Sequence, residues 1–238
     1  MNILKKLFKR KKRIWHISDT HTFHDLLTIP KNIDIVVHSG DCSNPRDPFN
    51  NEPEVRAFID WFSKLPIKHK IFVAGNHDTS IERSLVTRKD FMDAGITYIE
   101  TYSVNVAGLK IFGSPLTPQF GQWSFMKARH KLDRIWKNAI DDNVDIVIVH
   151  GPPKGILDKS YNRNGELESC GDKSLLNRIN EVKPKLVLFG HIHNCDDIVN
   201  AGVFKFSTYD TLFSNGSVVT DGKFGKLSSN GNIIELIQ

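Results

Sequence analysis

Histidine, aspartate and asparagine side chains that could bind metal ions recur in five short segments of the sequence. Each segment directly follows a short apolar run, and such runs are typical of buried strands. Imidazole, carboxylate and amide oxygen together are the ligand set of borderline-hard divalent cations such as zinc, iron, manganese or cobalt. The candidate ligands are Asp19, His21, Asp41, Asn76, His150, His191 and His193.

These groups are too many for a single ion. An ion that keeps an open position for chemistry rarely takes more than about three or four protein ligands. Two ions that share a bridging carboxylate would use the whole set, and Asp41 is the expected bridge because its two oxygens can serve both ions. Gly40 would permit the backbone turn that directs this carboxylate. Two metal ions roughly 3.5–4 Å apart suit attack on phosphorus by an activated water, so the pattern predicts phosphoester chemistry.

The elements that must position these groups are strands that end at one crevice. Ligands of α/β sheets collect beyond the carboxyl ends of such strands. Amphipathic spacing and proline positions predict helices that cover the sheets. The strands that lead to the ligands are 14–18, 33–37, 71–74, 144–149 and 186–189. Further strands are expected at 96–99, 103–106, 110–113, 204–206, 211–213, 217–220 and 232–236, and helices at 52–65, 124–141 and 172–182.

The ordered segments Asp-x-His, Gly-Asp, Gly-Asn-His-Asp, His-Gly and Gly-His-x-His resemble the calcineurin-like metallophosphoesterase superfamily. The His-Gly-Pro-Pro form at His150, and a Gly-Asp preceded by His-Ser, are most similar to its small metallophosphoesterase-domain-containing (MPPED-type) branch. The resemblance extends from about Trp15 to about Val219. It implies an α/β fold, a four-layer α/β/β/α sandwich of two mixed sheets flanked by helices.

The resemblance also implies roles for the matching residues. His77 would be the catalytic histidine that stabilises or protonates the departing oxygen, and Asp78 would orient its ring and keep it charged. The backbone would turn after the last of these strands and send His191 and His193 to different ions. We expect the first ion on Asp19, His21, Asp41 and His193, and the second on Asp41, Asn76, His150 and His191. Asn215-Gly216-Ser217 would support the site.

The predicted activity is that of a metal-dependent phosphoric ester hydrolase, and a phosphodiesterase for nucleotide-type substrates is favoured. Cyclic nucleotides, 2′,3′-cyclic ends and small nucleotide diesters all stay open. Manganese is the favoured cofactor, with iron, zinc, cobalt, nickel or magnesium as alternatives, because these ligands accept several ions. A nuclease or a phosphomonoesterase of the same fold is the alternative. A non-catalytic scaffold, the role of the retromer subunit with this fold, is disfavoured because the ligand set and His77 are complete.

Two further residues could contact substrate. Arg46 is the one cation of the loop 43–51 and could clamp a phosphate, and His24 lies in the loop after the first ligand segment. For both, a solvent-facing side chain is the alternative. The Pro-, Gly- and aromatic-rich segment 114–123 would lie near the mouth of the cleft, and 154–172 would rim the pocket.

The basic character of the chain is local. The 238 residues carry a formal charge of +5, but residues 5–13 hold seven cations and no acid, which leaves 25 basic against 27 acidic side chains elsewhere. We therefore divide the chain into a basic N-terminal extension, 1–13, and a single metallophosphoesterase domain, 14–238. The extension could bind nucleic acid or contact an anionic membrane surface weakly, although a solvated terminus is favoured.

The cysteines indicate a reducing compartment. Cys42, Cys170 and Cys195 are odd in number and widely separated, so they form no disulfide framework and a cytoplasmic location is the simplest expectation. No apolar run approaches the roughly 20 residues that span a bilayer, so no transmembrane segment is expected. No secretory signal is expected either. The sequence predicts no oligomeric state.

Overall fold

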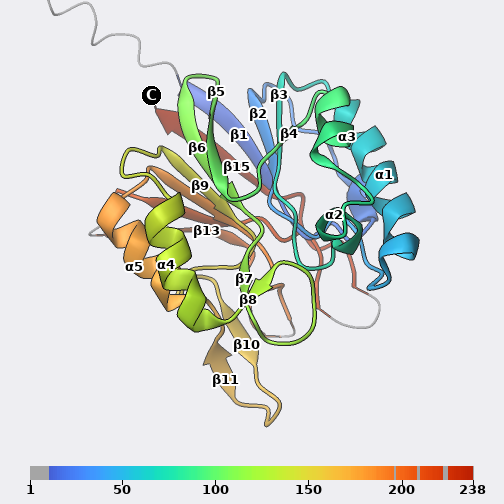
Figure 1. The fold of residues 1–238 in the computed structure, drawn as a ribbon. Helices are drawn as coiled ribbons and strands as arrows, with labels where there is room; N and C mark the ends of the chain where they lie inside the picture. The colour runs from blue at the N-terminus through green and yellow to red at the C-terminus, as the bar shows by residue number, and fades with distance from the viewer. Residues whose placement is uncertain (1–10, 196, 208–209, 222–224, 238) are drawn as a thin grey trace, which may run out of the picture.

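Two mixed β-sheets pack face to face in the middle of the structure (Figure 1), a computed structural model that describes residues 11–195, 197–207, 210–221 and 225–237. The first sheet has the order β15 (Asn232–Ile237), β1 (Lys11–Ile17), β2 (Ile35–His38), β3 (His69–Phe72) and β4 (Thr97–Tyr98). The second has the order β13 (Gly202–Lys205), β14 (Leu212–Asn215), β12 (Leu186–Phe189), β9 (Ile146–Val149), β6 (Leu109–Ser114) and β5 (Tyr102–Val106).

The inner strands of both sheets run parallel. β1 to β4 are parallel neighbours, and β15 closes the first sheet as an antiparallel edge. β14, β12, β9 and β6 are parallel neighbours, with β13 and β5 as antiparallel edges. Parallel neighbours end at the same edge of a sheet, so the carboxyl ends of the inner strands form one rim on each sheet.

Helices cover the outer face of each sheet. α1 (Pro48–Ser63), α2 (Thr79–Glu82) and α3 (Arg88–Asp93) lie on the side of the first sheet, and α4 (Arg129–Ala139) and α5 (Lys173–Val182) lie on the side of the second (Figure 1). The 3-10 helix η2 (Phe23–Leu26) contacts α1. Two small pairs complete the described fold: β7 (Thr117–Pro118) with β8 (Met126–Lys127), and β10 (Lys159–Tyr161) with β11 (Leu167–Ser169).

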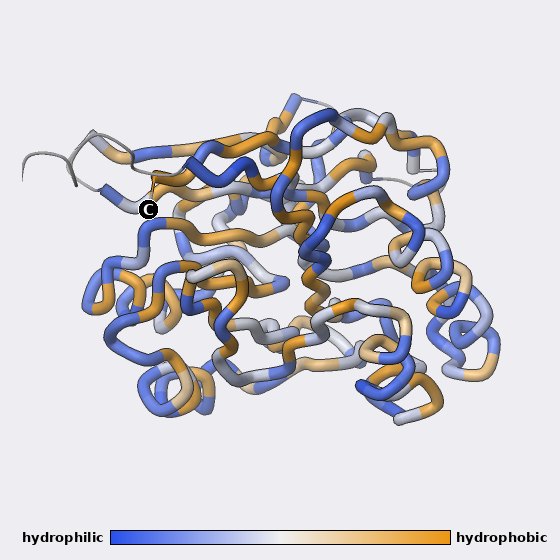
Figure 2. The backbone as a smooth tube through the Cα atoms, turned by 90° about the horizontal axis from the view of Figure 1, so that it is seen from above, coloured by the Kyte–Doolittle hydropathy of each residue, from blue (hydrophilic) through white to orange (hydrophobic). Residues whose placement is uncertain are grey.

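Three apolar clusters fill the three interfaces between these four layers. Alternate strand residues point to opposite faces, so Ile35 and Val37 of β2 pack between the sheets while Val36 packs toward α1. In the same way Val187 and Phe189 of β12 pack with the residues of α4 and α5. Figure 2 shows apolar stretches along the interior strands and alternating polar and apolar residues along the outer helices. The predicted four-layer α/β/β/α sandwich is confirmed.

Several element boundaries differ from the expectation. β1 begins at Lys11 and pairs with β15 from that residue onward, so residues 11–13 of the expected extension belong to a strand, while residues 1–10 lie outside the described part. α4 begins at Arg129, later than expected, because β8 occupies the preceding residues. The segment 154–172 contains the β10–β11 hairpin, and 217–220 forms isolated bridges in place of a strand.

The described helices include none that is both long and apolar enough to cross a bilayer. The three cysteines are free thiols.

Candidate metal centre

The seven predicted ligands meet at the rim where the inner strands of both sheets end. Two groups of ligand atoms form, and within each group the atoms lie within 4.8 Å of one another. Asn76 joins the second group, because its Oδ1 lies 3.0 Å from Nε2 of His150. The first group is Asp19, His21 and His193, and the second is Asp41, His150 and His191.

The backbone at this rim is bent sharply to direct the ligands. Four ligand residues have left-handed φ angles: Asp19 at 52°, His21 at 41°, Asp41 at 59° and His191 at 70°. Such conformations cost about 1–3 kcal/mol for a residue with a side chain and cluster at functional sites. The bend at His191 separates it from His193, and the two imidazoles join different groups as predicted.

Glycines allow the strands to approach each other at the ligands. A Cβ atom at Gly75 would lie 2.2 Å from Oδ1 of Asp41, and one at Gly190 would lie 2.1 Å from Oδ2 of Asp19. Gly40 has φ of 114°, as expected for the turn before Asp41. Each of these glycines therefore fills a position where a side chain would displace a ligand.

Three of the four ligand histidines present Nε2 to the site because a partner holds Nδ1. Nδ1 of His150 lies 2.9 Å from the carbonyl oxygen of Ser39, and Nδ1 of His21 lies 3.1 Å from that of Ser43. A carbonyl oxygen only accepts, so each Nδ1 carries a hydrogen, and each Nε2 is the atom that a cation would bind in place of a proton. Nδ1 of His193 pairs with the carboxylate of Asp221 at 3.1 Å. Such outer partners orient metal-ligating imidazoles, so the residues present fit two divalent cations.

The carboxylates and imidazoles shift each other's protonation. Burial raises the pKa of Asp19, but the charge of His193 outweighs it and holds that pKa well below its usual range. Burial lowers the pKa of His150, but the charge of Asp41 outweighs it and raises that pKa to about 9. Burial is outweighed in the same way at His193, whose pKa Asp19 raises to about 10. Burial and the charge of His150 lower the pKa of His191 to about 3. Without a cation, protons on the imidazoles balance the buried carboxylates.

Asp78 holds the loops together and does not orient His77. Its buried carboxylate accepts from the backbone N–H groups of Asp41, Cys42 and Gly75 at 3.0, 3.0 and 2.8 Å. The ring of His77 bonds elsewhere: its Nδ1 lies 3.1 Å from the carbonyl oxygen of Asn44. The expected Asp78–His77 ring contact is therefore wrong, because the short Gly-Asn-His-Asp turn directs the carboxylate back toward the β2 loop.

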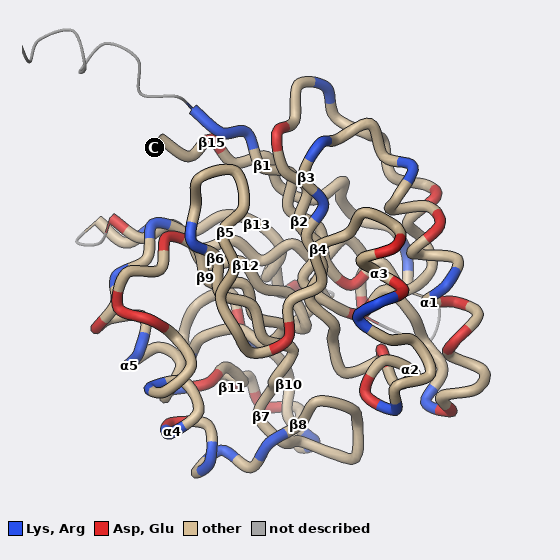
Figure 3. The backbone as a smooth tube through the Cα atoms, turned by 45° about the horizontal axis from the view of Figure 1, so that its top comes forward, with Lys and Arg blue, Asp and Glu red and all other residues tan. Residues whose placement is uncertain are grey.

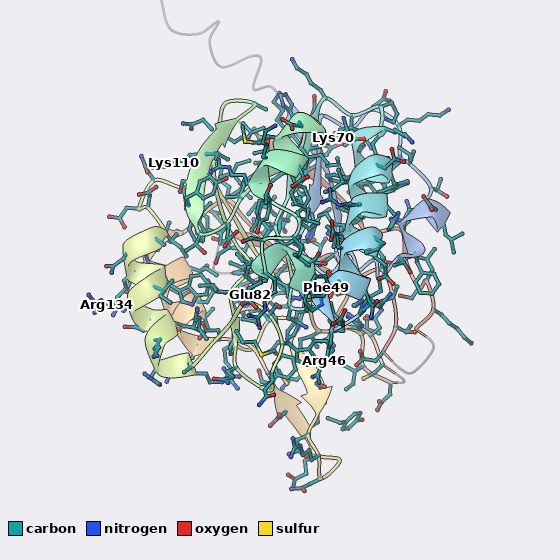
Figure 4. The ribbon with its side chains drawn as sticks, turned by 45° about the vertical axis from the view of Figure 1, so that its right-hand side comes forward. Arg46, Phe49, Lys70, Glu82, Lys110 and Arg134 are labelled. Atoms are coloured by element: carbon teal, nitrogen blue, oxygen red, sulfur yellow. The ribbon has the colours of Figure 1, made fainter. Side chains whose placement is uncertain are left out.

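An aromatic side chain that the sequence did not single out packs on His77. The rings of Trp123 and His77 have centroids 4.1 Å apart, and the guanidinium of Arg46 lies 3.8 Å above the Trp123 ring on this stack. Figure 4 shows Arg46 between α1 and the β10–β11 hairpin. Arg46 therefore reaches the site through Trp123, which belongs to the aromatic segment expected at the cleft mouth.

The structure does not bring His24 to the site. Its ring is buried against α1, with centroids 5.5 Å from Phe58 and 5.0 Å from Trp61, so a substrate contact is not supported. Ser217 does support the site as expected, since its hydroxyl donates to Asp19 at 2.7 Å. The sequence carried no signal for Asp221, whose role depends on how a distant loop folds over His193.

A family model described as calcineurin-like phosphoesterase matches residues 12–195. The chain belongs to the calcineurin-like phosphoesterase family. This confirms the resemblance carried by the five segments. The family is one of metal-dependent phosphoester hydrolases, in agreement with the two ligand groups.

Two curated relatives match most of the chain, and the first carries the name of the expected branch. The chain is similar to metallophosphoesterase domain-containing protein 1 of Homo sapiens, at 32% identity over 228 residues, 86% of this chain and 65% of the relative. It thus spans just under two thirds of that protein's length. It is also similar to UPF0046 protein C25E10.12 of Caenorhabditis elegans, at 32% identity over 218 residues, 84% of this chain and 75% of the relative.

Solved structures share the fold. TT1561 of Thermus thermophilus aligns with a TM-score of 0.59 at 14% identity, over 87% of this chain and 89% of that chain. A phosphopantetheinyl hydrolase from Mycobacterium tuberculosis aligns with a TM-score of 0.57 at 14% identity, over 89% of this chain and 90% of that chain. At such identities the likeness shows the fold alone.

Proposed function

We propose that the protein is a binuclear metal-dependent phosphodiesterase that acts on nucleotide-type phosphodiesters, with cyclic nucleotides among the candidate substrates. The observation that carries the proposal is the pair of ligand groups beside His77, with its ring 4.8 Å from that of His21. When bound, two divalent cations, of which manganese is our expectation, supply Lewis acidity at the phosphoryl oxygens and an acidified water as nucleophile. We propose Asp41 as the ligand shared by both.

His77 is suited to supply a proton to the leaving oxygen. The carbonyl oxygen of Asn44 accepts from Nδ1–H, so Nε2 is the atom that faces substrate, and the protonated ring would give the hydrogen on Nε2 to the leaving oxygen. The Trp123 ring restricts rotation of the imidazole from one side, and the backbone N–H of His77 donates to Oδ1 of Asp41 at 2.7 Å. The proton donor and the proposed shared ligand are thereby held in a fixed relation.

The shape of the site favours a diester. A cavity of about 670 Å³ is lined by His21, His77 and His193, and a separate cavity of about 730 Å³ is lined by His191. A phosphodiester carries two ester arms and uses space on both sides of the phosphorus, whereas a monoester uses one. The first cavity has no lysine or arginine among its described lining residues to clamp a dianionic monoester.

The alternatives make different predictions. A nuclease would use the basic residues 5–13, and Lys11 of this stretch is in β1 and pairs with Glu235 at 2.9 Å. The test is therefore removal of residues 1–10, which spares the strand. A salt-dependent loss of nucleic-acid turnover would favour the nuclease. The complete ligand groups and His77 speak against a scaffold, and the free cysteines agree with the proposed cytoplasmic location.

The proposal is tested by hydrolysis of bis-p-nitrophenyl phosphate against p-nitrophenyl phosphate. Metal-stripped protein is refilled with manganese, and His77→Ala is measured alongside. We expect diester turnover that requires metal and falls by about 100-fold or more in the variant, the scale of a lost general acid. Turnover of the monoester alone would change the assignment to a phosphatase. Bound metal without turnover of either ester would reject the enzyme.

A further inference from the structure

The cavity on the His191 side of the metal centre would take one ester arm of a diester, and its lining residues point to what that arm carries. Its volume of about 730 Å³ falls in the range of small-ligand sites, about 300–1,000 Å³. The β7–β8 pair, the start of α4 and the β10–β11 hairpin contribute to its walls, and these elements lie close together at one end of the molecule (Figure 1). A group held there would lie next to a phosphoryl group at the ligands.

The cavity is strongly basic. Its described lining contains four cations and one acid, which are Arg129, Lys154, Arg163, Lys173 and Glu168. None of the four cations forms a salt bridge with another residue that the structure describes. Figure 3 shows basic segments at β8 and at the start of α4 beside the hairpin. Cations that share one concave surface without neutralising partners create a positive potential that favours a polyanion.

Two of these cations are held in place by backbone carbonyl groups. The Arg129 guanidinium donates to the carbonyl oxygens of Gly171 and Cys170 at 3.0 and 2.9 Å. The ammonium of Lys154 donates to the carbonyl oxygen of Ser169. Carbonyl partners position a cation without cancelling its charge, so both groups remain able to make charge-assisted bonds to a phosphate.

An exposed aromatic ring contacts the candidate ligand His191 in the same cavity as these cations. Phe120 is 57% exposed, and its ring centroid lies 5.2 Å from that of His191. It also lines the cavity. An exposed aromatic face of this kind stacks on a base without selecting its identity.

We propose that this cavity is a subsite for a second phosphate group, so that the preferred substrates are phosphodiesters whose arm carries a base and a further phosphate. The proposal rests on the proposed function for the identity of the scissile group. A small nucleotide with a terminal phosphate and a short single strand of nucleic acid both offer this chemistry.

The test compares two ligands that differ by one phosphate. Calorimetry of the manganese-loaded protein would measure the Kd of thymidine 5′-monophosphate and of thymidine 3′,5′-bisphosphate. We expect the bisphosphate to bind at least about tenfold tighter, the scale of one charge-assisted contact. Arg129→Ala and Lys154→Ala should each reduce this ratio toward one and leave the Kd of the monophosphate unchanged. Equal affinities in the unaltered protein would overturn the proposal.

A matched control is available on the same helix. Arg134 is an exposed cation of α4 that lies outside the cavity lining, and Figure 4 shows it on the outer side of the helix. Arg134→Ala removes the same charge and should keep the affinity ratio. A ratio that falls equally in this variant and in Arg129→Ala would show a long-range charge effect and reject the subsite.

Turnover separates the two proposals. The p-nitrophenyl ester of thymidine 5′-phosphate is compared with the same ester carrying a 3′-phosphate. An affinity ratio that holds while neither ester is cleaved keeps the subsite and rejects the phosphodiesterase. Cleavage of both esters at equal kcat/KM, together with equal affinities for the two ligands, supports the phosphodiesterase and rejects the subsite. An oligothymidylate that binds tighter with each added phosphate identifies a strand as the source, and constant affinity identifies a small nucleotide.

Discussion

Replacement of Asp78 by alanine should lower the stability of the domain and weaken metal binding together. Three buried backbone donors, on Asp41, Cys42 and Gly75, lose their acceptor. A buried donor without a partner costs about 1–3 kcal/mol, so the free energy of unfolding should fall by at least about 3 kcal/mol. This is a large share of the roughly 5–15 kcal/mol that stabilise a domain. Because one donor belongs to the ligand Asp41 itself, metal affinity should fall about 10–100-fold.

The assay is urea unfolding of the metal-free protein, together with a manganese titration. Asp158→Ala is the matched control, since this buried carboxylate accepts from the N–H groups of Gly155 and Gly171 at 2.8 and 2.9 Å and belongs to neither ligand group. Of these two donors only the N–H of Gly171 is buried, so the variant should lose about 1–3 kcal/mol and keep its metal affinity. If Asp78→Ala loses turnover but keeps its stability and its metal binding, the reasoning is refuted. The carboxylate would then act by orienting the His77 ring, as the sequence predicts.

Three further predictions follow from the site. Ions must displace protons from His150 and His193, whose pKa values of about 9 and 10 keep both rings charged at neutral pH in the metal-free protein. Calorimetry in buffers of different ionisation enthalpy should therefore show release of about two protons when manganese binds, and the metal affinity should fall as the pH is lowered. Proton release near zero would contradict this. Gly190→Ala places a Cβ 2.1 Å from Oδ2 of Asp19 and should weaken manganese binding about 10–100-fold, so an unchanged titration would show that the loop can shift. Trp123→Ala should lower kcat about tenfold at unchanged metal affinity, because His77, the proposed proton donor, loses its packing. Trp123→Phe should retain most activity, and equal loss in both variants would show that the ring has no positioning role.

The convergence of the candidate ligands, and the strands that carry them, could be predicted because both depend on local sequence. A buried parallel strand is a short apolar run, and a ligand at its end, such as Asp41 after β2, needs only a short turn. The partners of the loops could not be predicted in this way. Asp221 reaches His193, and Trp123 reaches His77, through loops whose path depends on the packed structure.

The same limit explains the helix and the carboxylate that differ from expectation. The sequence pattern predicts a helix from residue 124 and identifies the apolar face of α4 correctly. The helix begins only at Arg129, because residues before it pair with β7 as strand β8. The sequence predicts that Asp78 contacts the ring of His77, because the two residues are adjacent. The turn places Asp78 under three N–H groups of the surrounding loops, which only the assembled structure provides.

Each ligand group combines side chains from both sheets. Asp19 and His21 follow β1 of the first sheet, whereas His193 follows β12 of the second, and the second group joins Asp41 after β2 to His150 after β9. A bound ion makes less favourable only those openings of the structure that separate its ligands. Metal loading should therefore slow hydrogen exchange along β1, β2, β9 and β12 together and leave exchange in the β10–β11 hairpin unchanged. On this reasoning, metal loading would make the two sheets unfold more cooperatively.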